Sequence, residues 1–285
     1  MKRLFLPLLI FLLATGYWIL CPNTKKDGVA PAPDLLRLEE AVEAQPDRTW
    51  RLFTRGRDRF PFVETVTYHQ EVPWLKGRPA WIVDYAKHYS TSRHFIARSL
   101  NGSPDYFSQS VKEGDRFNVF RNQEDFHFEL TVELASCSMD LVAVEGETRH
   151  WIKRYRVALG RPNRESPSGF LTPTGEFRVG QKHAVHEPGM KGDFRGKEVE
   201  LIQCFGTRWL SLEGQGEEDY LCGYGLHGVP WTWEENLSKY HPRDDMIGTY
   251  CSDGCIQLKQ SDIEEIYAIV LGQVAKVSIV DVRRE

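Results

Sequence analysis

The hydrophobic pattern divides the chain into an apolar start, a mixed middle and a strand-rich second half. In the second half, apolar and polar positions alternate over residues 126–134 and 139–144. Glu145-Gly146-Glu147 then supplies a turn, and the alternation runs back over residues 151–159. A period of two is typical of strands that bury one face. We therefore predict a series of short strands from residue 126 onward.

One helix interrupts the strands near the end of the chain. Its apolar stripe recurs at helical spacing and consists of Ile263, Ile266, Tyr267 and Val270. We predict a helix over residues 261–271, with Ser261 and Glu264 as a capping box and Gly272 ending it. A strand over residues 275–280 closes the chain. The second half is thus predicted to be mainly β with one late helix.

A mixed pattern between residues 61 and 125 predicts a small α+β domain. Two short helices are indicated by apolar residues at helical spacing, which are Trp81, Tyr85 and Tyr89, then Phe95, Ile96 and Leu100. Residues 111–120 follow as a Gly-Asp turn that enters a strand. This order resembles a LysM module, a small glycan-binding βααβ unit. An unrelated α+β spacer domain explains the pattern equally well.

The first 21 residues indicate export. A basic Met1-Lys2-Arg3 precedes seventeen uncharged and strongly apolar residues at positions 4–20. That length is at the lower edge of what crosses a bilayer as a helix. The segment fits a membrane anchor, a signal peptide cleaved at residues 14–16, or a lipid-attachment site at Cys21. Because each places the body of the protein outside the cytoplasm, we expect it in the periplasm or cell envelope, anchored by residues 4–20.

Residues 22–60 are predicted to be a linker with a short helix. Three prolines and Gly28 between residues 22 and 33 are typical of linkers, and Asp34 fits a helix cap. Five arginines follow within twelve residues, and they are Arg48, Arg51, Arg55, Arg57 and Arg59. They fit a solvated face beside the membrane, with an anionic lipid or wall polymer as the alternative partner.

Composition narrows the class of protein. Of 285 residues, 41% are hydrophobic and 27% charged, which excludes a disordered or multi-span membrane chain. The net charge of −4 is too small to indicate a nucleic-acid partner. Six cysteines are too few for a disulfide scaffold. Cys204 and Cys222 lie on candidate strands and can pair, whereas the turn between Cys251 and Cys255 suits a disulfide poorly.

Two short motifs in the second half fit nucleophilic catalysis. His227-Gly228 follows a candidate strand at residues 220–226, and Ser252-Asp253-Gly254-Cys255-Ile256 precedes the late helix. A cysteine nucleophile needs a base, an environment that favours the thiolate, and donors for an oxyanion. His227 fits the base, and the amides around Gly254 and Cys255 fit the donors. The Gly228 carbonyl or Ser252 fits the group that orients the imidazole.

The order of three motifs resembles the catalytic domain of L,D-transpeptidases, the YkuD-type domain. The motifs are Thr-Pro-Thr-Gly-Glu-Phe at residues 172–177, Tyr224-Gly225-Leu226-His227-Gly228, and the segment around Cys255. The resemblance implies a YkuD-like β-sandwich or barrel over residues 126–285. It also implies that Cys255 is the nucleophile, that His227 is its base and that Gly228 orients the imidazole. The remaining residues expected to shape the substrate and oxyanion pocket are Ser252, Asp253, Gly254, Gln257 and Tyr224.

The chain departs from the family pattern in three places. Asp253 stands where the family usually has His, and Gln257 stands where it usually has Arg. Cys255 follows His227 by 28 residues, a longer gap than usual. The excess, at residues 231–246, carries Trp231 and Trp233, and we predict a lid or substrate-contact loop there.

A zinc site is the alternative use of four of these residues. His183, His186, Cys251 and Cys255 are suitable ligand types, but both histidines fall in a Gly/Lys-rich loop. We expect no metal and no other cofactor.

The resemblance implies acyl transfer on peptidoglycan stem peptides. Cys255 attacks the carbonyl of the third stem residue, D-Ala leaves, and the thioester passes to an amine of a neighbouring stem as a 3–3 crosslink. The main alternative is the same fold used hydrolytically, as an L,D-carboxypeptidase or as an amidase that releases wall-bound protein. The second alternative is a non-enzymatic wall-binding protein.

Overall fold

The computed structural model describes residues 46–281, except residues 105, 107–110, 122–123, 217–220 and 222. The predicted signal or anchor at residues 1–21 and the predicted short helix after Asp34 lie outside the described residues. Across the described part of the chain, no helix is both long enough and apolar enough to span a membrane.

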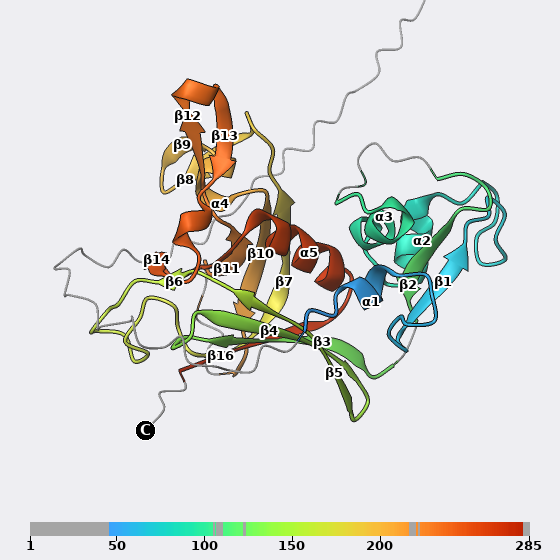
Figure 1. Ribbon diagram of the computed structural model, residues 1–285, viewed down its shortest axis with the longest axis horizontal. Helices are drawn as coiled ribbons and strands as arrows, with labels where there is room; N and C mark the ends of the chain where they lie inside the picture. The colour runs from blue at the N-terminus through green and yellow to red at the C-terminus, as the bar shows by residue number, and fades with distance from the viewer. Residues whose placement is uncertain are drawn as a thin grey trace, which may run out of the picture.

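An eight-stranded sheet forms the frame of the second half of the chain (Figure 1). Its strands follow the order β15-β11-β10-β7-β16-β3-β4-β5. Their bounds are β3 Phe126–Glu133, β4 Ser138–Glu145, β5 Thr148–Arg156, β7 Gly175–Val185, β10 Arg208–Gly214, β11 Gly225–Gly228, β15 Ile256–Leu258 and β16 Ala275–Val280. The sheet curls, so β3, β4 and β5 lie across one end while β7 and β10 rise from it. The fold class is mainly β with a late helix, as the alternation predicts.

Alternating burial holds the sheet around its core. On β3, Phe128, Leu130 and Val132 are fully buried and alternate with half-buried neighbours. β16 pairs in parallel with β3 and antiparallel with β7, so it joins the two halves of the sheet. The late helix α5, Gln260–Val270, buries one face, including Ile263, and packs on β10 and β11. The core therefore reaches up to the strand that carries His227.

The small α+β region is a βααβ unit. Its elements are β1 Val63–Thr67, α2 Ile82–His88, α3 Arg93–Asn101 and β2 Arg116–Phe120. β1 pairs antiparallel with β2, and the two helices lie between them in the chain. The sequence pattern indicated the helices and the second strand but not β1. The element order agrees with that of a LysM module, and the resemblance itself stays a prediction.

Continuous packing joins the βααβ unit to the sheet. Phe62, Phe95 and Phe120 belong to the same buried cluster as the apolar side chains of β3. At the start of α3, Ser92 Oγ donates a 2.6 Å hydrogen bond to the carbonyl of Ala268 in α5. The boundary predicted at residue 126 is thus bridged by a shared core.

Residues 46–60 belong to the folded part, where the sequence predicts a linker. The short helix α1, Trp50–Phe53, buries Leu52 completely. Asn118 Nδ2 on β2 donates to the carbonyl oxygens of Leu52 at 2.9 Å and Thr54 at 2.7 Å. Three of the five arginines donate to backbone carbonyls, and they are Arg51, Arg55 and Arg59. These three arginines therefore help to hold the local backbone in place, a structural role that the number of charges in the segment does not reveal.

The start of α5 differs from the predicted capping box, which is wrong. Lys259 occupies the N-cap and makes no side-chain cap bond. Glu264 instead accepts hydrogen bonds of 3.0 Å from Thr207 Oγ1 and from Gln260 Nε2. Glu264 thus bonds to Thr207, which is distant in the chain, instead of to the start of its own helix near Ser261.

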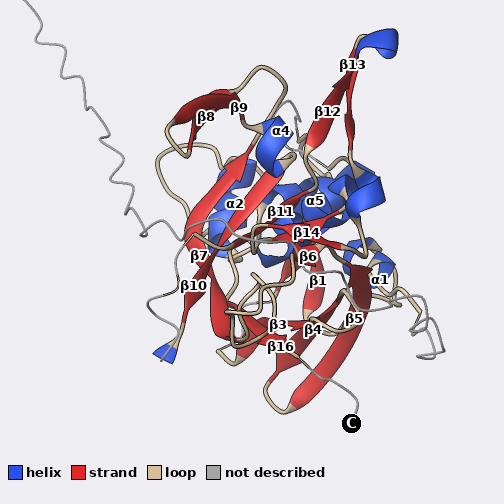
Figure 2. Ribbon diagram, turned by 90° about the vertical axis from the view of Figure 1, so that its left-hand side faces the viewer, coloured by secondary structure: helices blue, strands red, loops and turns tan. Residues whose placement is uncertain are grey.

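Two hairpins that the sequence analysis did not predict stand beside each other above the sheet (Figure 2). They are β8 Lys191–Phe194 with β9 Lys197–Glu200, and β12 Trp231–Glu234 with β13 Lys239–Pro242. The short helix α4, Ile202–Phe205, lies between them in the chain and in space. The strand predicted at residues 220–226 begins only at Gly225.

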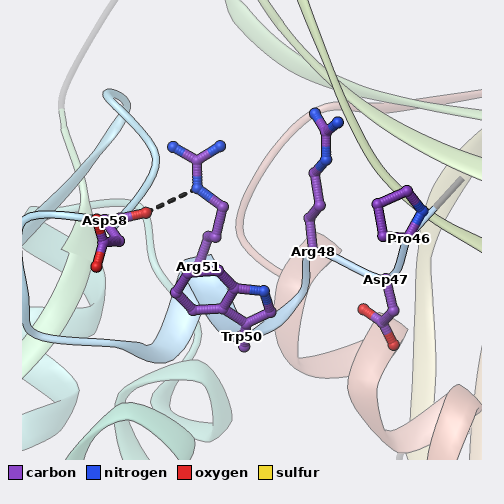
Figure 3. Close-up of a pocket in the computed structure, with 6 residues that line it drawn as sticks. All are labelled: Pro46, Asp47, Arg48, Trp50, Arg51 and Asp58. Carbon is purple, nitrogen blue, oxygen red and sulfur yellow. Dashed lines mark hydrogen bonds between the residues drawn. The ribbon is translucent and has the colours of Figure 1, made fainter.

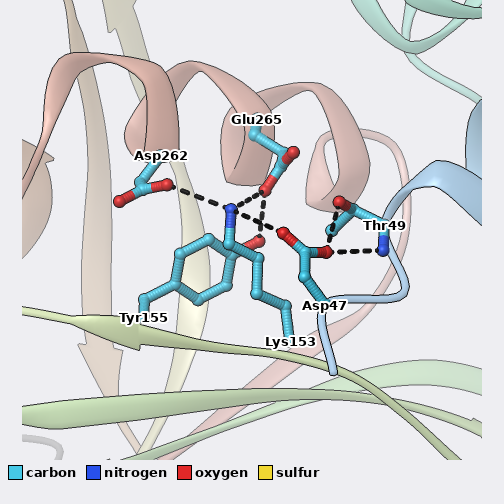
Figure 4. Close-up of polar contacts among 6 residues, drawn as sticks. All are labelled: Asp47, Thr49, Lys153, Tyr155, Asp262 and Glu265. Carbon is cyan, nitrogen blue, oxygen red and sulfur yellow. Dashed lines mark hydrogen bonds and ion pairs between the residues drawn. The ribbon is translucent and has the colours of Figure 1, made fainter. Parts of the chain in front are cut away.

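A cluster of ion pairs ties the N-terminal segment to α5 (Figure 4). Lys153 Nζ on β5 lies 2.9 Å from Glu265 Oε1, 3.1 Å from Asp262 Oδ1 and 3.5 Å from Asp47 Oδ2. Tyr155 donates a 2.9 Å hydrogen bond to Glu265 as well. Although burial disfavours the ammonium group, the carboxylates of Glu265 and Asp262 raise the pKa of Lys153.

We expect Lys153→Met to lower the free energy of unfolding by about 2–3 kcal/mol, because it leaves partly buried carboxylates without their cation. Urea denaturation of the full-length protein measures this change. The matched control is Lys191→Met, which removes an ion pair with Glu198 whose side chains are 67% and 70% exposed, and it should cost less than about 0.5 kcal/mol. Equal effects of the two substitutions would contradict the assignment.

Candidate active site

Cys255 lies in a tight turn that its own backbone neighbours hold in place. The turn joins β14, Tyr250–Ser252, to β15. Ser252 Oγ donates to the carbonyl of Cys255 at 2.6 Å and accepts from the Gly254 amide at 3.1 Å. Ser252 is buried, so these bonds fix the backbone on both sides of the cysteine.

Gly254 is required at its position by both conformation and space. Its φ of +121° lies in a region that side chains disfavour. A Cβ there would lie 2.6 Å from the Tyr224 ring and 2.9 Å from the Leu171 carbonyl oxygen. The carbonyl of Gly254 accepts a 2.9 Å hydrogen bond from Thr172 Oγ1, which in turn accepts from the Gly160 amide at 2.7 Å. Thr172, fully buried, therefore anchors the turn to the neighbouring β6, Leu159–Gly160.

Strand pairing brings His227 to the same place. β11 and β15 run parallel, with Leu226 opposite Ile256 and His227 opposite Gln257. His227 Nδ1 lies 2.7 Å from the carbonyl oxygen of Gly228. Because a carbonyl only accepts, this contact places the proton on Nδ1 and leaves Nε2 as the basic nitrogen.

Aromatic rings enclose the imidazole. His227 stacks on Trp209, with ring centroids 5.5 Å apart, and meets the edge of Phe205 at 5.4 Å. Trp209 is its register partner on β10, so the stack follows from the sheet. Burial lowers the pKa of His227 to about 4, and the hydrogen bond with the Gly228 backbone only partly offsets this.

The thiol is also held in its neutral form. Burial raises the pKa of Cys255 to about 11. Hydrogen bonding to the Gly225 backbone lowers the pKa, Asp253 raises it and Arg195 lowers it by smaller amounts. Burial thus favours the protonated thiol of Cys255 and the neutral imidazole of His227.

The other residues predicted for the site differ in their contacts. Tyr224 covers Gly254, as the clash of an added Cβ shows. Gln257 is buried, its backbone exchanges hydrogen bonds with Ala158, and its side-chain oxygen lies 4.0 Å from Cys251 Sγ. The Gly254 amide donates to Ser252 Oγ at 3.1 Å, and its role as an oxyanion donor stays a prediction. The Cys255 amide is the donor that we expect to face an oxyanion.

Asp253 lies on the surface between two arginines that the sequence did not indicate. Its carboxylate contacts Arg161, and its second oxygen lies 2.9 Å from Arg195 Nη2. Arg195 is in the β8–β9 hairpin, far from Asp253 in the chain, and no sequence motif connects them. Phe205 and Trp209 are the other contributors that spacing alone did not reveal, whereas Thr172 belongs to the motif at residues 172–177.

Among the remaining cysteines and histidines, His186 lies close to the site, where its ring is 6.0 Å from that of Phe205. Cys137, Cys204, Cys251 and Cys255 are free thiols, and Cys222 lies outside the described residues. In the ranges that the structure describes, no group of three His, Cys, Asp or Glu residues is placed to hold a metal ion. His186 Nδ1 lies 3.1 Å from the carbonyl oxygen of Gly206, which accounts for its position.

The segment predicted as a lid is the β12–β13 hairpin followed by a 3₁₀ turn, Asp244–Met246. Two aromatic residues stabilise the hairpin, since Trp233 packs on Tyr240 with ring centroids 4.9 Å apart. Tyr240 OH contacts Glu200 on β9 and accepts from Gln203 Nε2 at 2.9 Å. The hairpin is therefore tied to the neighbouring β8–β9 hairpin, and its role as a lid stays a prediction.

Comparison with known proteins agrees with this geometry. The family model described as YkuD, the L,D-transpeptidase catalytic domain, matches residues 128–279, just over half of the chain. No curated protein matches the chain.

Several solved structures share a limited likeness. Bd1075 from Bdellovibrio bacteriovorus is 18% identical, over 56% of this chain and 50% of that chain, with a TM-score of 0.38. Pgp2 from Campylobacter jejuni, a helical cell shape determining protein, is 15% identical over 56% and 50%, with a TM-score of 0.39. An L,D-transpeptidase from Mycobacterium tuberculosis is 15% identical over 60% and 75%, with a TM-score of 0.34.

The match spans about half the length of the first two of these structures, and TM-scores this low add nothing to the family match. The family match itself covers nearly all of the curled sheet from β3 to β16 and includes both His227 and Cys255. The chain belongs to the YkuD family of L,D-transpeptidase catalytic domains.

Proposed function

We propose that the protein is a peptidoglycan L,D-transpeptidase that forms 3–3 crosslinks between stem peptides outside the cytoplasm. The observation that carries the proposal is the parallel pairing of β11 with β15, which sets a neutral His227 beside the turn that presents Cys255. A histidine base that acts on a cysteine thiol is what cysteine acyl transfer needs. The apolar residues 4–20 support export, and stem peptides in the wall lie on that side of the membrane.

The first half of the reaction forms a thioester. As Cys255 Sγ attacks the carbonyl carbon of the third stem residue, its proton passes to His227 Nε2. The Gly228 carbonyl stabilises the resulting imidazolium through Nδ1, and the Cys255 amide faces the oxyanion. The C–N bond then breaks, and His227 returns the proton to the departing amine of D-Ala.

The second half of the reaction repeats these steps with an amine as the nucleophile. The amine of a neighbouring stem attacks the thioester carbonyl and gives a proton to His227 Nε2. The C–S bond breaks, and the sulfur recovers the proton from the imidazolium. One peptide bond has been exchanged for another, so the crosslink forms without a nucleotide or other energy source.

We propose two further contacts with the envelope. The βααβ unit fits a glycan-binding role through its LysM-like element order. At the start of the described chain, an open pocket is lined by Pro46, Asp47, Arg48, Trp50, Arg51 and Asp58 (Figure 3). The guanidinium groups of Arg48 and Arg51 point to the same side of this segment, which suits an anionic lipid or wall polymer.

Alkylation of Cys255 tests whether the free pair is neutral. The rate with iodoacetamide should rise about tenfold per pH unit between pH 7 and 10, because only the thiolate reacts and its pKa is about 11. At pH 7.5 the rate should be roughly a hundredfold below that of a free cysteine. Peptide mass spectrometry follows each cysteine separately.

His227→Gln is the informative variant for this measurement. If the imidazole is neutral, the variant loses acyl transfer but keeps the pH profile of alkylation. A fast, pH-independent plateau below pH 7 that disappears in His227→Gln would instead demonstrate a thiolate–imidazolium pair.

Incubation of the full-length protein with a disaccharide-tetrapeptide tests the proposed reaction. Mass spectrometry of the products should show a dimer that lacks one D-Ala, and Cys255→Ala should abolish it. Cys204→Ala, which removes a half-buried cysteine outside the site, is the control and should keep full activity. Release of D-Ala without dimer would replace the proposal with a carboxypeptidase, and no change would favour an amidase or a binding protein.

A further inference from the structure

Two arginines converge on Asp253, the surface residue that precedes Gly254 in the Cys255 turn. Arg161 Nη2 contacts one oxygen of Asp253, and Arg195 Nη2 lies 2.9 Å from the other. The side chains of Arg161, Arg195 and Asp253 are 58%, 66% and 45% exposed. Exposed ion pairs contribute little to stability, so this cluster is poorly explained as a structural tie.

The backbone positions both arginines with respect to the catalytic pair. Arg161 donates its amide to the Ser252 carbonyl at 3.0 Å, and its own carbonyl accepts from the Leu171 amide at 2.9 Å. These bonds attach Arg161 to the strand that leads into the Cys255 turn. The backbone of Arg161, from which its guanidinium group extends, is therefore held next to the Cys255 turn.

Arg195 is placed from the opposite side by an aromatic chain. Its guanidinium lies 5.1 Å from the ring centroid of Phe194. Phe194 meets Phe205 at 5.1 Å, and Phe205 meets His227 at 5.4 Å. Arg195 also has φ +56°, in the left-handed region that a residue other than glycine rarely adopts. The β8–β9 hairpin thus holds a cation over the site through the same rings that enclose the base.

We propose that Arg161 and Arg195 form a carboxylate-binding subsite, which Asp253 fills in the free protein and the free C-terminal carboxylate of the donor stem fills during reaction. The identity of this ligand rests on the proposed function. Guanidinium groups bind carboxylates through charge-assisted hydrogen bonds, and here each arginine contacts one oxygen of Asp253. In the free protein, the carboxylate of Asp253 occupies the position that we assign to the carboxylate of the substrate.

The chemistry of the donor selects which carboxylate reaches the subsite. In a tetrapeptide stem, the scissile nitrogen is bonded to the Cα of the last residue, and that Cα carries the free carboxylate. When Cys255 attacks the scissile carbonyl, this carboxylate lies within a few bonds of the reacting carbon. A stem with one more residue, or with an amidated end, offers a neutral amide at the same point. The subsite therefore selects donors that end one residue beyond the scissile bond.

Paired alkylating reagents test the subsite without any stem peptide. Iodoacetate carries a carboxylate and iodoacetamide does not, while both need the Cys255 thiolate. The ratio of their rates at Cys255 cancels changes in thiol pKa and reports anion binding alone. We expect the ratio to fall roughly tenfold in Arg161→Gln and in Arg195→Gln, and to rise in Asp253→Asn, which frees both arginines.

Arg178→Gln is the matched control, because Arg178 is also 58% exposed and forms an ion pair with Glu213 on the sheet. It should leave the ratio unchanged. Arg161→Lys and Arg195→Lys keep the charge but lose the fork of donors, so they should give intermediate ratios. A ratio that is the same in wild type, Arg161→Gln and Arg195→Gln overturns the proposal.

A second measurement separates this proposal from the proposed function. Turnover of a free-carboxylate tetrapeptide should exceed that of its C-terminal amide in wild type, through a lower KM, and Arg161→Gln should remove the preference. If the rate ratio of the two alkylating reagents behaves as expected while no stem is turned over, the subsite stands and the proposed reaction fails. If stems are turned over with no preference for the carboxylate, the reaction stands and the subsite is overturned.

Discussion

The parallel pairing of β11 with β15 is the contact on which the rest of the site depends. His227 and Cys255 are 28 residues apart, and this pairing, with His227 opposite Gln257, brings their two segments together. β11 is also paired with β10, which sets Trp209 against the imidazole. A shift of one residue in either register would turn His227 to the other face of the sheet and away from Cys255.

Burial has opposite effects on the two reacting groups, and both favour a neutral pair. Removing water disfavours the thiolate, which raises the pKa of Cys255, and disfavours the imidazolium, which lowers the pKa of His227. In the reaction proposed above, the proton therefore moves as the thiol attacks the substrate and the developing charges gain partners. Asp253 and Arg195 stand close enough to influence the thiol, so charge at the mouth of the site acts on its chemistry.

Much of the fold follows from local pattern, and much of the site does not. Alternation on β3 and β4 and the apolar stripe of α5 appear in the sequence because burial has a regular period there. The capping box failed because Glu264 finds a partner in Thr207, which is distant in the chain. Arg51 and Arg59 looked like solvated charge, yet both donate to nearby backbone. His227 and Cys255 were found by motif, whereas Arg161 and Arg195 meet only through the tertiary fold.

The central claim is that Cys255 carries the acyl group between donor and acceptor, with His227 as its base. The measurement that tests it most directly is the intact mass of the full-length protein, quenched in acid after mixing with a tetrapeptide donor and no acceptor amine. The account predicts an adduct equal to the donor minus D-Ala, bound at Cys255, released by hydroxylamine and absent in Cys255→Ser. Turnover of the donor without any such adduct, or with an unchanged adduct in Cys255→Ser, would contradict it.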